Sequence, residues 1–234
     1  MSKTKPPVNP LLQSKRRRIG PGVIVVIVLV LALGGGVGVQ YWRSHSGVSV
    51  SSNGGPEPTV ITGPGTNGQG VKIGQASAKV NIDLYIDFRC PHCEEFESES
   101  GTTINKLVDD GTATVTYWPL TFVSPDSPRL ANAFAAAAAN GKAQSYADEI
   151  YADFSKSWTE DQLIELGKQL GIDDAKFETA IKDNSYAGWL ESIGQEASTR
   201  KVEGTPTVFV NDKMLAADVL TPEGIQKAVI GAAG

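Results

Sequence analysis

The only two cysteines of this chain stand in the stretch CPHC, residues 90–93, directly after a segment with the pattern of a strand. In that segment apolar side chains occupy every second position, which is the period of a β-strand: Val80, Ile82, Leu84, Ile86 and Phe88. From the cysteines to about Asp110 the sequence indicates a helix, because acids come early and Gly111 follows the last apolar residues. The cysteine pair therefore stands where a strand turns into a helix.

Strands and helices alternate along the rest of the chain. Residues 112–120 have the composition of a second strand, so that strand, helix and strand form a βαβ unit. A long helical section follows at about 127–202, with a break near Gly141. After Gly204 the sequence indicates a strand, a tight turn, a short partner strand and a C-terminal helix. This order predicts an α/β domain over residues 71–234.

The chain begins with a basic tail, residues 1–18, and a long apolar segment follows it. Residues 19–39 contain no ionisable side chain, and a helix of that length would rise roughly 30 Å, which is the thickness of the hydrocarbon core of a bilayer. Tyr41 and Trp42 come next, as an interfacial aromatic belt requires, and the basic tail marks the cytoplasmic side. We therefore expect one transmembrane anchor over residues 19–42. A cleaved signal peptide and a buried core helix are the alternatives.

Residues 43–70 are rich in Gly, Ser and Pro and show no apolar period, which predicts a flexible linker that spans roughly 30 Å. Residues 1–43 contain seven Lys or Arg and no acid, so the remaining 14 basic residues face all 26 acids. The domain beyond the linker is therefore strongly acidic. This charge argues against nucleic acid as a partner, because phosphate binding needs a basic face.

The spacing of the cysteines limits what they can do. A pair that served stability would close a longer loop, because the entropy removed from the unfolded chain grows with loop length. A structural zinc site needs four ligands, and the chain offers two cysteines and two histidines, of which His45 lies in the predicted linker. Covalent haem attachment needs histidine directly after the second cysteine, where Glu94 stands. Redox chemistry remains, and a disulfide persists beyond the cytoplasmic membrane.

The strand-to-helix turn gives the two cysteines different roles. Unpaired N–H groups and the macrodipole at the helix N-terminus stabilise an anion, so the thiolate of Cys90 is favoured there. Cys93 lies one turn later and is expected to be more buried. Cys90 would therefore attack a partner and Cys93 would resolve the mixed disulfide. The ring of His92 can donate a hydrogen bond to the Cys90 sulfur and would favour the thiolate further.

Three stretches in order, DFRCPHCEEF, VDDGTATVTYWPL and EGTPTVFVND, with a helical section before the third, resemble the DsbA-like thiol-disulfide oxidoreductases. The resemblance covers about residues 71–232. With its apolar segment and glycine-rich linker, the chain is also similar to the membrane-tethered oxidases of actinobacteria. The resemblance implies a thioredoxin fold with a helical insertion, preceded by one transmembrane helix and a flexible linker.

The resemblance also implies roles for particular residues. Cys90 is implied to be the nucleophile and Cys93 the resolving thiol, while Pro91 and His92 tune the reduction potential. Thr205-Pro206 is implied to be a cis peptide that faces the cysteines, with backbone groups of Thr205 pairing with the bound substrate chain. No metal or cofactor is expected beyond a redox-active disulfide between the two cysteines.

The sequence departs from the family pattern at one position. Many thioredoxin-like proteins carry a buried acid six residues before the first cysteine, and Leu84 stands there in this chain. Asp83 and Asp87 flank it on the other face of the strand. Either one is a candidate for transferring the proton of Cys93, and a structural role is the alternative.

The leading functional expectation is an extracytoplasmic, monomeric dithiol oxidase that introduces disulfides into unfolded secreted or surface proteins. Its reduced cysteines would be reoxidised by a membrane partner that resembles DsbB or a vitamin K epoxide reductase homologue. A membrane-anchored reductase is the second reading, although His92 argues against it. An isomerase is a weaker reading, because no dimerisation segment precedes the domain. A binding module whose cysteines only close a loop is the third.

Overall fold

The computed structural model describes residues 56–65 and 68–234. The predicted basic tail, the predicted anchor and most of the predicted linker lie outside these residues. In the part of the chain that is described, no helix has both the length and the apolar character needed to cross a bilayer.

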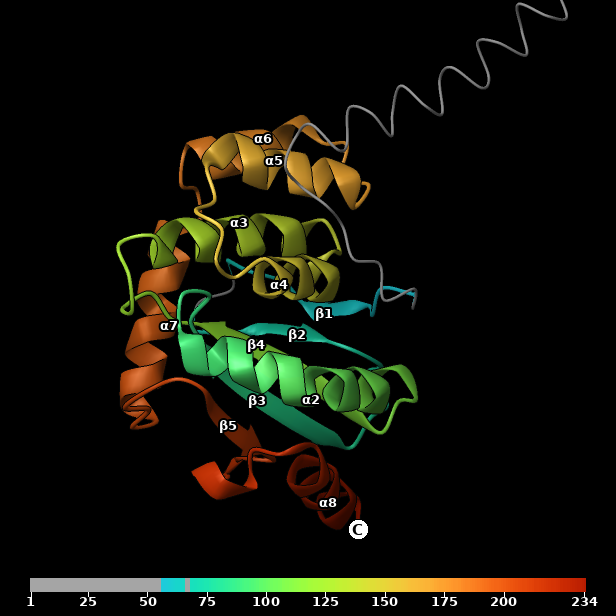
Figure 1. Ribbon diagram of the computed structural model, residues 1–234. Coiled ribbons are helices and arrows are strands. Elements are labelled where there is room, and N and C mark those ends of the chain that lie inside the picture. The colour runs from blue at the N-terminus through green and yellow to red at the C-terminus, as the bar shows by residue number, and fades with distance from the viewer. Residues whose placement is uncertain (1–55, 66–67) are drawn as a thin grey trace, which may run out of the picture. The chain divides into compact units, whose positions relative to one another are not determined.

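Six strands of the described chain form one sheet in the order β1-β2-β4-β3-β5-β6 (Figure 1). Their bounds are β1 Val60–Thr62, β2 Val71–Ile73, β3 Val80–Ile86, β4 Ala113–Pro119, β5 Thr207–Val210 and β6 Lys213–Met214. Strands β3 and β4 run parallel, as the predicted βαβ unit requires, and all other neighbours pair antiparallel. The alternating segment found in the sequence is β3, which lies in the centre of the sheet with β4 and β5 on either side.

The predicted linker extends too far. Residues 60–62 form β1, which pairs with β2, so the prediction of a linker over all of 43–70 is wrong in its last part. A strand of three residues is too short to show an alternating pattern, and only its pairing partner makes it a strand. Gly70 then passes so close to β4 that an added Cβ would lie 2.6 Å from the carbonyl oxygen of Tyr117.

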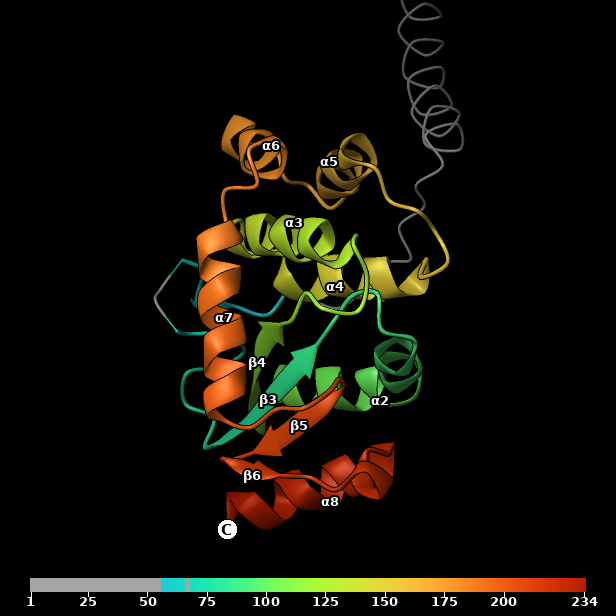
Figure 2. The same cartoon turned by 90° about the vertical axis from the view of Figure 1, so that its left-hand side faces the viewer.

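The helices fall into two groups. Two of them, together with a short 3-10 helix, belong to the sheet-forming part of the chain: α2 Pro91–Asp109, η2 Ala217–Val219 and α8 Pro222–Ala233. The others form the predicted helical insertion: α3 Ser127–Ala139, α4 Ala143–Ala152, α5 Glu160–Gln169, α6 Ala175–Lys182 and α7 Ala187–Thr199. The fold is therefore a thioredoxin-like α/β fold with a helical insertion, as the resemblance implied. Figure 2 shows α2 and α7 on opposite sides of the sheet.

Aromatic side chains join the insertion to the sheet. Phe88, which follows β3, packs against Phe134 of α3 and Tyr151 of α4, with ring centroids 5.2 and 5.3 Å apart. Phe134 also packs edge-on against Tyr117 of β4. All four rings are buried. Packed aromatic rings stabilise a contact by more than the burial of their apolar surface alone. These rings therefore hold the insertion against the end of β3 that leads to the cysteines.

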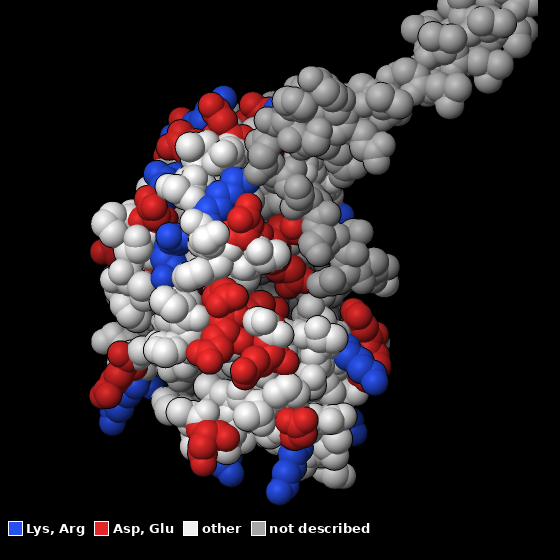
Figure 3. Space-filling view, viewed as in Figure 1, with Lys and Arg blue, Asp and Glu red and all other residues white. Residues whose placement is uncertain are grey.

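Three carboxylates meet where α2, α4 and the segment before β1 come together. Glu57 accepts hydrogen bonds from the N–H groups of Gln144 (2.9 Å) and Ser145 (3.3 Å) in the first turn of α4. Burial raises the pKa of Glu97 in α2 to about 7. Burial and the charges of Glu97 and Glu57 raise the pKa of Asp148 in α4 to about 8. Figure 3 shows acidic side chains gathered over α2 on this face.

Gly101 explains how the cluster is accommodated within α2. The carboxylate of Glu97 lies against Gly101 one turn later, in space that any Cβ would occupy. The helix α2 continues through this glycine without a break. The glycine therefore costs helix propensity and makes room for a partly buried acid.

These pKa values predict that the stability of the domain falls as the pH rises. A carboxyl whose pKa is raised by folding binds a proton in the folded state that the unfolded state has released. The stabilisation is complete below about pH 4 and is lost as the pH rises through about 8. Urea unfolding should therefore show a declining free energy of unfolding from about pH 5 to about pH 9.

Glu97→Gln should flatten this decline and leave the protein more stable above about pH 8, by on the order of 1 kcal/mol. The matched control is Glu99→Gln, which removes an exposed acid from the same helix. An equal effect of both variants would contradict the interpretation, because it would indicate general charge repulsion.

Candidate active site

Cys90 and Cys93 lie at the N-terminus of α2, with Cys90 as the N-cap residue. The Cys90 N–H donates to the carbonyl oxygen of Asp87 (2.9 Å), and its carbonyl oxygen accepts from the N–H groups of Cys93 (3.0 Å) and Glu94 (3.2 Å). Both cysteines are free thiols in the structure, 5% and 1% exposed. The Cys90 side chain makes no capping hydrogen bond to the helix. Its sulfur is therefore the side-chain atom that lies next to the unpaired N–H groups of the first turn of α2.

The segment before β5 brings a carbonyl group to this sulfur from far along the chain. The Thr205-Pro206 peptide bond is cis. The Cys90 thiol donates a hydrogen bond to the carbonyl oxygen of Thr205, with 3.3 Å between the sulfur and the oxygen. The hydroxyl oxygen of Thr205 is buried and has no hydrogen-bond partner in the structure. The proline and the cysteine motif, 115 residues apart, therefore form one site.

Cys93 is held in its neutral form. Burial raises the pKa of its thiol well above the ordinary value, and hydrogen bonds from its surroundings offset only part of this effect. A neutral thiol is a poor nucleophile, because the thiolate is the reactive species. Cys93 therefore has to lose its proton before it can resolve a mixed disulfide.

The residues between the cysteines lie on the surface. Pro91 is the first residue of α2 and is exposed. The His92 ring is 79% exposed and its Nδ1 lies 3.5 Å from the Glu95 carboxylate. No hydrogen bond of the described residues joins this ring to the Cys90 sulfur, so the expected donation from His92 is not present. The ring prefers the carboxylate one turn ahead because the helix places residues i and i+3 on the same face.

Asp87 is a fully buried acid whose carboxylate accepts four hydrogen bonds. Its Oδ1 accepts from the Arg89 N–H (2.8 Å) and the Ser127 hydroxyl (2.7 Å). Its Oδ2 accepts from the N–H groups of Phe122 and Val123, both at 3.1 Å. These bonds satisfy the carboxylate completely. They tie the end of β3 to the loop that enters α3.

Asp83 is engaged elsewhere. It lies on the α7 side of the sheet, pairs with Arg200 (3.1 Å), and accepts from the Trp118 ring N–H (2.9 Å) and the Asn81 amide (3.0 Å). Among the hydrogen bonds of the described residues, none joins a carboxylate oxygen of Asp83 or Asp87 to Cys93. The hydrogen bonds of both acids therefore hold the fold, and neither carboxylate is hydrogen-bonded to Cys93.

Three residues at the site were not singled out in the sequence. Arg89, next to Cys90, donates to the carbonyl oxygens of Phe154 (2.7 Å) and Lys156 (3.3 Å) in the loop after α4. Tyr151 of α4 donates its hydroxyl to the carbonyl oxygen of Asp87 (3.3 Å). Phe122, held by Asp87, is 62% exposed. The position of Arg89 next to a cysteine of the motif could have indicated its role from the sequence. No local pattern in the sequence indicates that Tyr151 or Phe122 belongs to the site.

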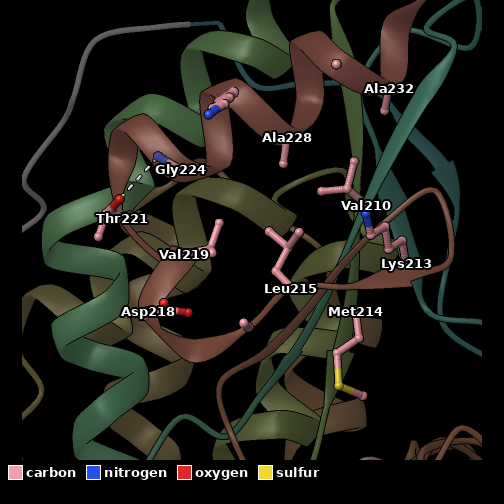
Figure 4. Close-up of a pocket in the computed structure, with 13 residues that line it drawn as sticks. Val210, Lys213, Met214, Leu215, Asp218, Val219, Thr221, Gly224, Ala228 and Ala232 are labelled. Atoms are coloured by element: carbon pink, nitrogen blue, oxygen red, sulfur yellow. Dashed lines mark hydrogen bonds between the residues drawn. The ribbon is translucent and has the colours of Figure 1, made fainter.

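A groove elsewhere in the domain does not include these residues. It has a volume of about 830 Å³ and lies between β6, η2 and α8. Figure 4 shows Leu215, Val219 and Ala228 pointing into it, and Asp218 lies at its edge. Neither the cysteines nor Thr205 and Pro206 line this groove. In the described part of the chain, no group of three or more His, Cys, Asp or Glu side chains is arranged to hold a metal ion.

The class of protein follows from the sulfur chemistry and the sheet order. Two thiols one helical turn apart can be joined by a disulfide, and the outer sulfur lies beside the cis-proline segment, so the site has the arrangement of a DsbA-like dithiol-disulfide oxidoreductase with a thioredoxin fold. A family model described as thioredoxin matches residues 66–230, and the chain belongs to this family.

The curated relatives that the chain matches differ in name and in how much of their length the match covers. The chain is 31% identical over 143 residues to the Na(+)/H(+) antiporter NhaA 3 of Salinispora tropica, and the match covers 60% of this chain. It spans only 21% of the length of that curated relative. It is 24% identical over 145 residues to the thiol:disulfide interchange protein DsbA of Pectobacterium carotovorum, which covers 60% of this chain and 70% of that protein.

Among solved structures, the chain is similar to the thiol-disulfide oxidoreductase MdbA from Actinomyces oris, with a TM-score of 0.62. The two are 24% identical, and the match covers 71% of this chain and 91% of MdbA. At this level of identity the likeness is one of fold.

The different environments of the two thiols predict selective alkylation. In the reduced native protein at about pH 8, iodoacetamide should modify Cys90 alone, because Cys93 stays protonated and buried. Mass spectrometry should find a single adduct, and Cys90→Ala should remove it. Two adducts on the folded protein at similar rates would contradict the assigned difference between the thiols.

The structural role of Asp87 gives a second prediction. Asp87→Asn replaces one acceptor oxygen by a donor and should destabilise the domain by about 2 to 4 kcal/mol. Ser127→Ala removes only one of the four bonds and should cost about 1 kcal/mol. The rate of exchange with dithiothreitol, measured on folded protein, should stay within about twofold of the wild-type rate for both variants. A large loss of rate in Asp87→Asn alone would restore this acid as a proton-transfer candidate.

Proposed function

We propose that this protein is an extracytoplasmic oxidase that introduces disulfide bonds into secreted or surface proteins. The observation that carries the proposal is the contact between the Cys90 sulfur, at the N-terminus of α2, and the Thr205 carbonyl oxygen beside the cis-proline. It brings the reactive sulfur and a backbone segment that can pair with a client chain to one place on the surface.

The proposed reaction consists of two thiol-disulfide exchanges. A client thiolate attacks the Cys90 sulfur of the oxidised pair, the bond between Cys90 and Cys93 breaks, and Cys93 leaves as a thiolate that takes up a proton. A second client thiolate then attacks the client sulfur of the mixed disulfide, and Cys90 leaves as a thiolate. The client loses two electrons and the cysteine pair gains them. No cofactor beyond this disulfide enters the reaction.

The helix end favours this direction. The N–H groups of the first turn of α2 and the helix macrodipole stabilise a negative charge on the Cys90 sulfur. A stabilised thiolate is a good leaving group and favours the reduced form of the pair, which makes the oxidised form the stronger oxidant.

The surroundings of the site suit an unfolded polypeptide as the client. Phe122 and Val123 are 62% and 40% exposed, yet Asp87 fixes their backbone beside the motif. Adjacent exposed apolar side chains can form a surface that binds apolar side chains of a partner. An unfolded chain offers both the apolar side chains for this surface and the free backbone groups for Thr205.

Location and recycling complete the proposal. The apolar residues 19–39 would anchor the protein in the cell membrane with the cysteines outside, where disulfides persist. Each turnover leaves Cys90 and Cys93 reduced, so a membrane oxidase that resembles DsbB or a vitamin K epoxide reductase homologue would reoxidise them.

The experiment is oxidative refolding of a reduced, disulfide-dependent client protein by the oxidised full-length protein. Refolding should accelerate by on the order of tenfold or more over the uncatalysed reaction. Cys90→Ala and Cys93→Ala should each abolish the effect, because neither variant can form the disulfide that accepts the two electrons of the client.

Two outcomes would contradict the proposal. One is no acceleration although both cysteines are oxidised at the start. The other is a reduction potential, measured against glutathione, as low as that of thioredoxin, together with a mostly reduced pair in thiol trapping from cells. That combination would identify a reductase.

A further inference from the structure

The segment that carries the cis-proline is short and is held mainly at its ends. Residues 201–206 connect the end of α7 to the start of β5. Within the segment, the Val202 N–H donates to the carbonyl oxygen of Ala197 and the Thr207 hydroxyl donates to that of Gly204. The remaining hydrogen bond, from the Cys90 thiol to the carbonyl oxygen of Thr205, is the contact that forms the candidate active site. The position of Thr205 therefore depends on how firmly the two ends are fixed relative to each other.

One side chain binds both ends. Arg200 is the residue directly before the segment and caps the C-terminus of α7. Its Nη2 pairs with Asp212 in the turn after β5 (3.0 Å), and its Nη1 pairs with Asp83 of β3 (3.1 Å). Its guanidinium also lies over the ring of Phe209 in β5, 4.1 Å from the ring centroid. A single planar group thus joins the residue before the segment to the strand after it.

The neighbours of Arg200 are fixed in turn. Asp83 is held by Trp118 and Asn81, and the Tyr85 hydroxyl lies 3.3 Å from Nη1 of the arginine. The Arg200 side chain is only 18% exposed. The planar guanidinium of Arg200 binds two carboxylates and stacks on a ring, so few conformations of its side chain remain possible. It therefore fixes the position of the neighbouring backbone more narrowly than the flexible ammonium group of a lysine would.

We propose that Arg200 is a positioning residue that holds the Thr205-Pro206 segment at the correct distance from Cys90 for a polypeptide client. This inference rests on the proposed function, because the segment matters for a client only if a client pairs with it. Arg200 touches neither cysteine, so it acts through the backbone of residues 201–206.

This positioning role predicts different effects on the oxidation of polypeptide clients and of small thiols. Dithiothreitol needs only access to the Cys90 sulfur, whereas a polypeptide must also align its backbone with Thr205. Loosening the segment should therefore weaken client binding and leave the sulfur chemistry unchanged.

The test measures oxidation of an unstructured peptide with two cysteines and of dithiothreitol by the full-length oxidised protein. Arg200→Met should raise KM for the peptide on the order of tenfold and leave kcat and the dithiothreitol rate within about twofold of wild type. Arg200→Lys keeps the positive charge and loses the planar guanidinium, so its KM for the peptide should lie between those of the wild type and Arg200→Met. Lys168→Met, which breaks an ion pair with Glu178 within the insertion, is the control and should leave all rates unchanged.

Hydrogen exchange of the same variants tests the mechanism without any client. Amides of residues 201–205 should exchange faster in Arg200→Met than in wild type, and those of α2 should not. An unchanged segment, or an equal loss of rate with dithiothreitol and peptide, would overturn the inference. If the wild-type protein itself fails to oxidise the peptide, the proposed function is wrong, and the exchange measurement still decides whether Arg200 fixes the segment.

Discussion

The buried carboxylate of Asp87 is the constraint on which the site depends. It stands between the last residue of β3 and the cysteines, and its two oxygens bind the backbone of the loop after β4 and the first residue of α3. Its carbonyl oxygen receives the N–H of Cys90 and the hydroxyl of Tyr151. A buried carboxylate needs all of its hydrogen bonds, since an unmet one costs about 1 to 3 kcal/mol. The catalytic turn, the entry to the insertion and α4 are therefore placed by one residue.

The chemistry follows from a difference between two identical side chains. Cys90 occupies a helix N-cap, where the backbone N–H groups favour an anion, and its sulfur meets the Thr205 carbonyl. Cys93, one turn later, faces the apolar interior, and burial keeps its thiol protonated. In the proposed reaction, the same helix therefore presents the Cys90 sulfur as nucleophile and leaving group and keeps the Cys93 thiol protonated. Leu84, which is itself buried, occupies the position where many thioredoxin-like proteins carry an acid.

Arginines connect the insertion to the site from two directions. Arg89 reaches from the motif to carbonyl groups in the loop after α4, and Arg200 reaches from the end of α7 to β3 and the turn after β5. The insertion is therefore part of the active-site framework, since its first helix is anchored by Asp87 and its last helix leads into the cis-proline segment. Burial raises the pKa of Glu97 and of Asp148, so the contact between α2 and α4 is weakened when these two acids ionise.

The sequence by itself determined what repeats locally: the alternation that makes β3, the early acids and late glycine that bound α2, and the break at Gly141 between α3 and α4. Each of these depends on neighbours along the chain, which a pattern can record. The tertiary structure alone decided that residues 60–62 are a strand, that His92 faces Glu95 instead of the Cys90 sulfur, and that Asp83 and Asp87 are structural acids. Those outcomes depend on partners 10 to 117 residues away in the chain or on a choice between two nearby partners, and hydrogen-bond distance is a property of the folded chain that residue order does not contain.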